Sequence, residues 1–372
     1  MKSIDRRQWL KKAGLGSGFT LMGGLGPIAV SGKELIATPV DTGIAKLNSN
    51  ENPFGPSKRV RSAISKAFDD ACRYPSVVFR PLLEQIAETE GVPTDHIVIT
   101  GGSTEGLKAT GLTYGIDQGE IIAADPTFQA MLRYAEGFGA YVHRVPVDDQ
   151  LGHDLNAMSQ RINNKTRLIF ICNPNNPTGT LLEKNDLRDF CSTISQKAVV
   201  FSDEAYYDFI MEPDYPSMVE LVKDGMNVIV SKTFSKVYGL AGMRIGYLVA
   251  RPDIASRLRK NIMAMTNVLA IEAAKEALKD DAFYTFSLTK NMEAKNAIYK
   301  TLDDLNLEYI KSHTNFVFFK SGRPISELIP AMKKEHVIVG RPFPPFYGWC
   351  RISTGTLPQM AQFDTALKKV LS

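Results

Sequence analysis

The chain has 372 residues, of which 44% are hydrophobic and 23% charged, an ordinary composition for a globular protein. Its formal net charge is +4, and residues 1–31 carry all of it, because five Lys and Arg face one Asp there. The neutral remainder argues against a nucleic acid or an acidic membrane surface as partner. The four cysteines form no CxxC pair, so a zinc or thiol-exchange site has no support, and no metal site is predicted.

The first segment of the chain resembles a twin-arginine export signal. Arg6 and Arg7 precede a glycine-rich, mildly apolar run that ends near Ala29 and Ser31, where small residues suit a cleavage site. The run is too short and too rich in glycine for a stable membrane span. Residues 1–31 are therefore predicted to direct the protein to the periplasm or outside the cell. The alternative is an amphipathic N-terminal helix on a cytoplasmic protein.

Short β-branched segments alternate with helical patterns from about residue 90 onward. The predicted strands are residues 96–100, 119–125, 167–172, 198–203 and 227–231, and a helix is predicted over 183–196. This alternation predicts a mostly parallel sheet with helices on both faces, and hence an α/β protein.

After Arg251 the pattern indicates a smaller α+β domain. Residues 270–305 are predicted to be mostly helical, strands are predicted at 315–319, 336–340 and 349–353, and a helix begins near Ile325. The predicted division of the chain is a signal over 1–31, an N-terminal arm with part of the small domain over 32–65, a large cofactor-binding domain over 66–265 and a small C-terminal domain over 266–372.

Polar groups and one aromatic side chain follow the five predicted strands of the large domain, where an open parallel sheet binds its ligands. They are Ser103 and Thr104, Phe128, Asn176, Asp203 and Tyr206, and Lys236 and Arg244. Each alone is more often a helix cap or a core residue, although an Asp that ends a buried strand is costly without a cation or donors. Together they suit pyridoxal phosphate, which has a phosphate, a flat ring, a phenolic oxygen, a ring nitrogen and an aldehyde that bonds to lysine.

Seven motifs, in order, resemble those of the fold-type I pyridoxal-phosphate-dependent aminotransferases. They are NENPFGPS (50–57), RYP (73–75), GGSTEGL (101–107), NPNNPTG (173–179), DEAYYDF (203–209), TFSKVYGLAGMRIGY (233–247) and CRISTGT (350–356). From about Asn48 onward the chain is most similar to the histidinol-phosphate aminotransferase branch. The resemblance implies an aspartate-aminotransferase-like fold, a homodimer, and transfer of an amino group from a small-molecule donor to a 2-oxo acid such as 2-oxoglutarate. It also implies cis peptide bonds before Pro126 and Pro177.

The resemblance implies roles for individual residues. Lys236 matches the lysine that bonds to the cofactor, and Lys232 does not. Asp203 matches the carboxylate that pairs with the ring nitrogen, and Tyr206 matches a partner of the phenolic oxygen. The remaining cofactor-binding matches are Asn176 at the phenolic oxygen, Phe128 against the ring, Ser103, Thr104, Thr233, Ser235 and Arg244 at the phosphate, and Tyr74, which reaches the phosphate of the other subunit.

Arg351, Arg341 and Asn52 are the predicted substrate-binding residues. Arg351 matches the arginine that holds the substrate anion, and two guanidinium groups suit a phosphate ester. The aromatic residues of 343–349 suit an imidazole or another ring. The arm over 32–47 has no Tyr, unlike many relatives that act on histidinol phosphate, so an aromatic or other amino acid is the second choice of donor.

Two other activities stay open on this evidence. A decarboxylase or racemase on the same scaffold would use the same cofactor residues. A cofactor-binding regulator without chemistry is disfavoured, because no helix-turn-helix pattern precedes Asn48.

Overall fold

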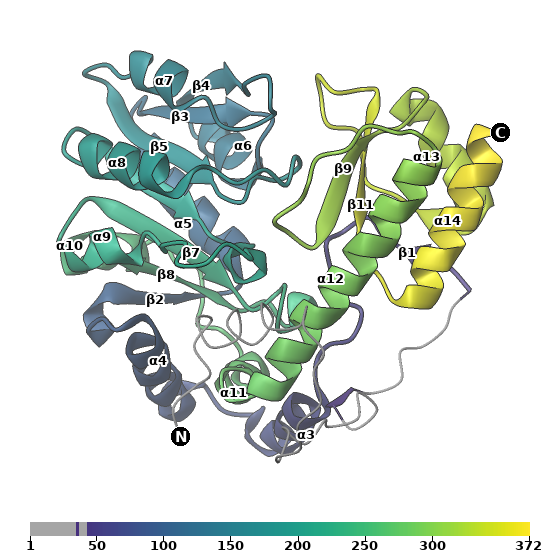
Figure 1. Ribbon diagram of the computed structural model, residues 1–372. Helices are drawn as coiled ribbons and strands as arrows, with labels where there is room; N and C mark the ends of the chain where they lie inside the picture. Colours follow the sequence, from purple (N-terminus) through teal and green to yellow (C-terminus); the bar gives the residue numbers. More distant parts are fainter. Residues whose placement is uncertain (1–34, 37–42) are drawn as a thin grey trace, which may run out of the picture.

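The computed structural model describes residues 35–36 and 43–372 of the chain (Figure 1). The predicted export signal, residues 1–31, lies outside these residues. Within the described ranges, no helix combines the length and apolar character that crossing a bilayer requires.

A seven-stranded sheet forms the larger part of the molecule, with the strand order β2-β8-β7-β6-β5-β3-β4. Its strands are β2 (Ile97–Thr100), β3 (Glu120–Asp125), β4 (Tyr141–Pro146), β5 (Thr166–Cys172), β6 (Val199–Asp203), β7 (Val228–Thr233) and β8 (Gly246–Ala250). Only β8 runs antiparallel to its neighbours in this sheet. The five predicted strands are confirmed, and β4 and β8 are additions. The edge strand β4 was missed because most of its residues are exposed or half-buried, so it lacks a continuous apolar run.

Helices cover both faces of this sheet, as predicted, because successive strand residues point to opposite sides. Ile169 and Ile171 of β5 join a core with α4 (Ser76–Glu90), α7 (Leu155–Gln160), α8 (Lys184–Ile194), α9 (Val219–Lys223) and α11 (Val268–Ala277). Leu168 and Phe170 face the opposite core with α5 (Ser103–Gly115), α6 (Ala130–Gly137) and α10 (Pro252–Arg259).

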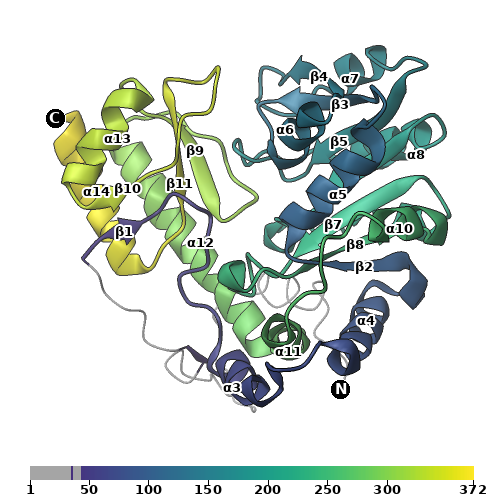
Figure 2. The same ribbon diagram turned by 180° about the vertical axis from the view of Figure 1, so that it is seen from behind.

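A second lobe is built around the antiparallel pair β9 (Phe316–Lys320) and β11 (Trp349–Ser353). Figures 1 and 2 show it beside the sheet lobe, with the long helix α12 (Asp281–Asp304) running from α11 to it. Its other elements are α13 (Ile325–Lys334), β10 (Val337–Ile338) and α14 (Leu357–Leu371). The early strand β1 (Ala45–Lys46) pairs with β10, and α3 (Lys58–Ala67) follows it. The N-terminal segment therefore reaches the second lobe before the chain enters the sheet.

Two local details differ from the expectations. The predicted helical run over 270–305 is divided, because Asp280 caps α12 by accepting a hydrogen bond from the backbone N of Phe283. Cis peptide bonds precede Pro126 and Pro174, so the expectation is confirmed at Pro126 and wrong at Pro177.

Candidate active site

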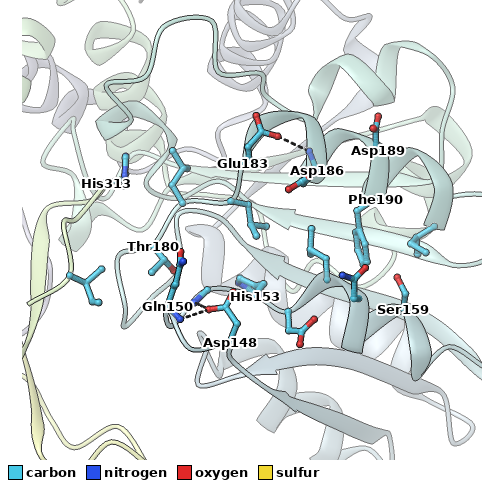
Figure 3. Close-up of a pocket in the computed structure, with 18 of the residues that line it drawn as sticks. Asp148, Gln150, His153, Ser159, Thr180, Glu183, Asp186, Asp189, Phe190 and His313 are labelled. Carbon is cyan, nitrogen blue, oxygen red and sulfur yellow. Dashed lines mark hydrogen bonds between the residues drawn. The ribbon is translucent and has the colours of Figure 1, made fainter.

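A cleft of about 940 Å³ is lined by several acidic side chains (Figure 3). Several of these carboxylates serve the local backbone. Glu183 accepts hydrogen bonds at the start of α8, one of them from Asp186, and Asp148 accepts one from Gln150 in a turn. None of the predicted site residues lines this cleft. Its size therefore does not identify it as the reaction site.

A smaller cavity, about 320 Å³, lies between the carboxyl ends of the parallel strands and the second lobe. It gathers residues from segments that are far apart in the sequence. The predicted residues that line it are Ser103, Thr104, Phe128, Asn176, Asp203, Tyr206, Ser235, Lys236, Arg244, Arg341 and Arg351. The chemistry expected from the strand ends is thus assembled at one place.

Lys232 lies on β7 and belongs to a buried ion cluster outside this cavity. Its Nζ lies 2.9 Å from Oε2 of Glu90 and 3.8 Å from Oε2 of Glu204. Burial alone would lower the pKa of Lys232, but these two carboxylates raise it well above its ordinary value. A lysine held in its charged form is a poor nucleophile, so Lys232 has a structural role.

Lys236 lies four residues later, past the end of β7, and lines the cavity. Its Nζ donates a hydrogen bond of 2.9 Å to the backbone carbonyl of Asn50. Burial, helped by the nearby charge of Arg351, lowers its pKa to about 8. A useful fraction of this amine is therefore neutral near physiological pH and able to attack a carbonyl.

Asp203 ends β6 and is 2% exposed. Its carboxylate accepts one hydrogen bond, from the backbone N of Ala205 at 3.2 Å, and no Lys or Arg among the described residues lies within ion-pair distance. Burial raises its pKa to about 7. A buried carboxylate without an ion-pair partner would be stabilised by a cationic group of a ligand bound in the cavity.

The hydroxyl of Tyr206 is oriented by two amides. Its Oη accepts hydrogen bonds from Nδ2 of Asn50 at 2.8 Å and from Nδ2 of Asn176 at 3.3 Å. Because both bonds use oxygen lone pairs, the O–H hydrogen is left to be donated elsewhere. Burial raises the pKa of Tyr206, so the group acts as a neutral donor.

Arg351, on β11, fixes the orientation of the Asn176 amide. Its Nη1 donates to Oδ1 of Asn176 at 2.7 Å, and its Nη2 donates to the carbonyl of Asn48 at 2.8 Å. Its Nε is buried without a partner, and burial lowers its pKa to about 10. An unpaired donor on a buried cation indicates a place for an anion.

The other end of the cavity is suited to a phosphate. Helix α5 begins at Ser103, and the backbone N–H groups at a helix start can bind an anion. The preceding residue, Gly102, has φ +83°, and a Cβ at this position would collide with the guanidinium of Arg244. The positive φ favours glycine at this position, and the guanidinium of Arg244 lies close to the start of α5.

Three predicted site residues do not line the cavity. Thr233 lies behind Ser235, to whose Oγ it donates a hydrogen bond. Asn52 is held outside the cavity, where its Nδ2 donates to the carbonyl of Val237 and to Oγ of Ser287, and its substrate-binding role stays a prediction. Tyr74 is 89% exposed, and its role across a homodimer interface stays a prediction.

The aromatic residues of 343–349 are divided between packing and exposure. Phe343 and Trp349 are buried in a cluster with Phe318, and neither lines the cavity. Phe343 nevertheless lies against the guanidinium groups of Arg341 and Arg351, and Tyr347 is exposed, so the ring-binding role of this stretch stays a prediction. Sequence reasoning in turn missed Asn50, which the motif NENPFGPS does not distinguish from Asn52.

Comparison with known proteins gives matches over most of the chain. The family model for aminotransferase class I and II matches residues 42–370. The histidinol-phosphate aminotransferase of Moorella thermoacetica is 38% identical over 333 residues, covering 88% of this chain and 86% of that relative.

Solved structures show the same fold. A histidinol-phosphate aminotransferase from Sinorhizobium meliloti, in complex with pyridoxal-5'-phosphate, superposes with a TM-score of 0.82 at 26% identity, covering 88% of this chain and 90% of that one. The aspartate aminotransferase of Thermotoga maritima gives a TM-score of 0.78, covers 88% of this chain and 92% of its own, and at 20% identity shows the fold alone. The predicted aspartate-aminotransferase-like fold is confirmed.

Proposed function

This chain belongs to the class I and II aminotransferases, and on that premise we propose that it transfers an amino group from histidinol phosphate to 2-oxoglutarate. The chain is a pyridoxal-phosphate-dependent aminotransferase. The observation that carries the donor assignment is the pair of guanidinium groups, Arg341 and Arg351, in the cavity that holds Lys236 and Asp203.

The residues of the cavity fit pyridoxal phosphate. Within the described part of the chain, no Lys or Arg lies within ion-pair distance of the buried Asp203 carboxylate, which accepts one backbone hydrogen bond, and Ser103, Thr104 and Arg244 line the cavity where they could hold an anion. When bound, the cofactor supplies an aldehyde that bonds to amines and a ring that withdraws electrons. The residues that would hold it are Lys236 at the aldehyde, Asp203 at the ring nitrogen, Tyr206 and Asn176 at the phenolic oxygen, Phe128 at the ring face, and Ser103, Thr104, Ser235 and Arg244 at the phosphate.

Lys236 is the group that would move the proton of the reaction. Its amine is partly neutral near pH 8, so Nζ can take a proton from the amino donor and return it. The carbonyl of Asn50 holds this nitrogen at the cavity wall between transfers. The carboxyl of Asp203 would pair with a cationic group in the cavity, and the hydroxyl of Tyr206 would donate a hydrogen bond to a group bound there.

The two arginines differ in how firmly the protein holds them. Arg351 is 8% exposed and bonded to Asn176 and Asn48. Arg341 is exposed, and its Nη1 donates only to the carbonyl of the next residue, Pro342. A phosphate ester with a charge near −2 would engage both, whereas a carboxylate would be satisfied by one.

Replacing Arg341 by alanine should therefore separate the candidate donors. We expect kcat/KM to fall roughly 10- to 100-fold for histidinol phosphate, the loss of one charged hydrogen bond, and to change little for an aromatic amino acid. Arg351→Lys keeps the charge but loses the planar fork, so it should raise KM for both donors. Steady-state kinetics with 2-oxoglutarate as acceptor provide the measurement. Equal effects of Arg341→Ala on both donors, or no turnover of histidinol phosphate by the wild type, would remove the phosphate assignment.

The same assays distinguish the related activities. A transaminase consumes its 2-oxo acid in proportion to product, whereas a decarboxylase or racemase needs no acceptor. Turnover that continues without any 2-oxo acid would therefore favour those alternatives.

We further propose that residues 1–31 direct export by the twin-arginine route. The support is the Arg6–Arg7 pair and the confinement of the net charge to this segment. Changing both arginines to lysine should hold the protein in the cytoplasm with its cofactor bound, which cell fractionation would detect. Wild-type protein found wholly in the cytoplasm, with residues 1–31 still attached, would dispose of the proposal.

A further inference from the structure

Asn50 has an unusual backbone for a buried residue. Its φ is +53°, in the left-handed region that L-residues other than asparagine and aspartate seldom adopt. It is 2% exposed and lines the cavity. A residue kept in a sparsely populated conformation beside a reaction site is often held there for function.

Two hydrogen bonds of Asn50 end on reactive groups. Its carbonyl oxygen accepts from Nζ of Lys236 at 2.9 Å, and its Nδ2 donates to Oη of Tyr206 at 2.8 Å. One residue thus contacts both the amine and the phenol of the site, through its main chain and its side chain respectively.

The remaining bonds fix Asn50 itself. Its backbone N donates to Oγ of Ser353 at 2.8 Å, and the same Oγ donates to Oδ1 of Asn50 at 3.0 Å. Nδ2 of Asn315 donates to the Asn50 carbonyl at 3.0 Å. These bonds come from the second lobe and determine which way the Asn50 amide faces.

We infer that Asn50 is a positioning residue that holds the free amine of Lys236 and aims the hydroxyl of Tyr206 into the cofactor cavity. The inference requires a pyridoxal phosphate enzyme but no particular amino donor.

The chemistry of the two bonds supports these tasks. A neutral amine that donates an N–H to a carbonyl keeps its lone pair, so Lys236 can rest against Asn50 and still accept a proton. The amides of Asn50 and Asn176 together occupy the oxygen of Tyr206, which leaves its O–H hydrogen as the group to be donated. Glycine would permit the same backbone but lacks the amide, and aspartate would accept the Tyr206 hydrogen instead of donating to it.

The test uses the holoenzyme of Asn50→Asp and Asn50→Gly, without substrate, and follows the absorbance of bound cofactor against pH. The titrating chromophore loses a proton as pH rises, and the Tyr206 hydroxyl stabilises the electron-rich form that remains. We expect the apparent pKa to rise by about one unit or more in Asn50→Asp, a tenfold or larger change in the proton equilibrium. A smaller rise is expected in Asn50→Gly, which keeps the carbonyl for Lys236. In both variants kcat should fall more than KM rises, because Asn50 lies at the amine and phenol and not at the arginine pair.

Asn52→Asp is the matched control, since Asn52 stands two residues away and its side chain lies outside the cavity. The charged groups that act on Lys236 are Arg351, Glu51, Asp203 and Arg244, and none is altered in these variants. A wild-type titration curve in Asn50→Asp with cofactor bound, or an equal shift in Asn52→Asp, would overturn the inference. Should Asn50→Asp fail to fold, an unshifted curve in Asn50→Gly would overturn it equally.

Discussion

Replacing Lys236 by alanine is expected to abolish transamination and the yellow colour of protein-bound cofactor. Lys236 is the cavity lysine whose pKa burial lowers to about 8, so we expect it to serve as both the covalent anchor and the proton carrier. Proton transfer by a positioned group alone is worth roughly 10²- to 10⁴-fold, and loss of the anchor adds to that. Absorbance spectra of the purified protein and an assay with the best donor would measure both effects.

Lys232→Ala is the informative companion of this variant. It should keep the colour, because Lys232 lies outside the cavity, yet it should lower the free energy of unfolding by about 3–5 kcal/mol. The reason is that Glu90 and Glu204, both buried, would lose their shared cation. Thermal unfolding would report this loss. The assignment of Lys236 as the lysine that bonds to the cofactor would be reversed if Lys232→Ala folded without colour while Lys236→Ala stayed coloured and active.

Changing Asp203 to asparagine should lower turnover by roughly 10²- to 10³-fold, as for other lost electrostatic contacts to a reacting group. The change keeps the shape of the side chain and removes its charge. Without that charge the cofactor ring would no longer keep its nitrogen proton and would withdraw electrons less strongly. Cofactor should still bind through Lys236 and the phosphate residues, which a cofactor titration would verify. Near-normal turnover with cofactor bound would refute this role.

The pH dependence of stability offers a check on Asp203 that is independent of turnover. Burial raises its pKa to about 7, so without cofactor the folded protein binds this proton more tightly than the unfolded chain does. Its contribution to stability is therefore present at low pH and is lost as pH rises from about 4 to 7. Thermal unfolding of both cofactor-free proteins would give the free energy of unfolding of wild type and of Asp203→Asn. The difference between the two should decline over this pH range.

Much of the site could be predicted from short stretches of sequence. Strands such as β5 and β6 are continuous apolar runs that end in polar motifs, and parallel strands bring their carboxyl ends to one edge. The positions of Asp203, Lys236 and Ser103 at that edge follow from chain order alone. The edge strand β4 did not follow because most of its residues are exposed or half-buried. The strand β8 is a buried apolar run, but such a run carries no information about the direction of the strand.

Only the tertiary structure decided which of two similar residues close in sequence belongs to the site. Lys232 and Lys236 stand only four residues apart, but Glu90, 142 residues before Lys232, forms an ion pair with Lys232 and leaves Lys236 to the cavity. Asn50 and Asn52 share one motif, and a left-handed backbone held by Ser353 turns only Asn50 toward the reactive groups. These differences depend on charges and hydrogen-bond partners that packing brings from distant parts of the chain. A local pattern of residues therefore cannot predict them.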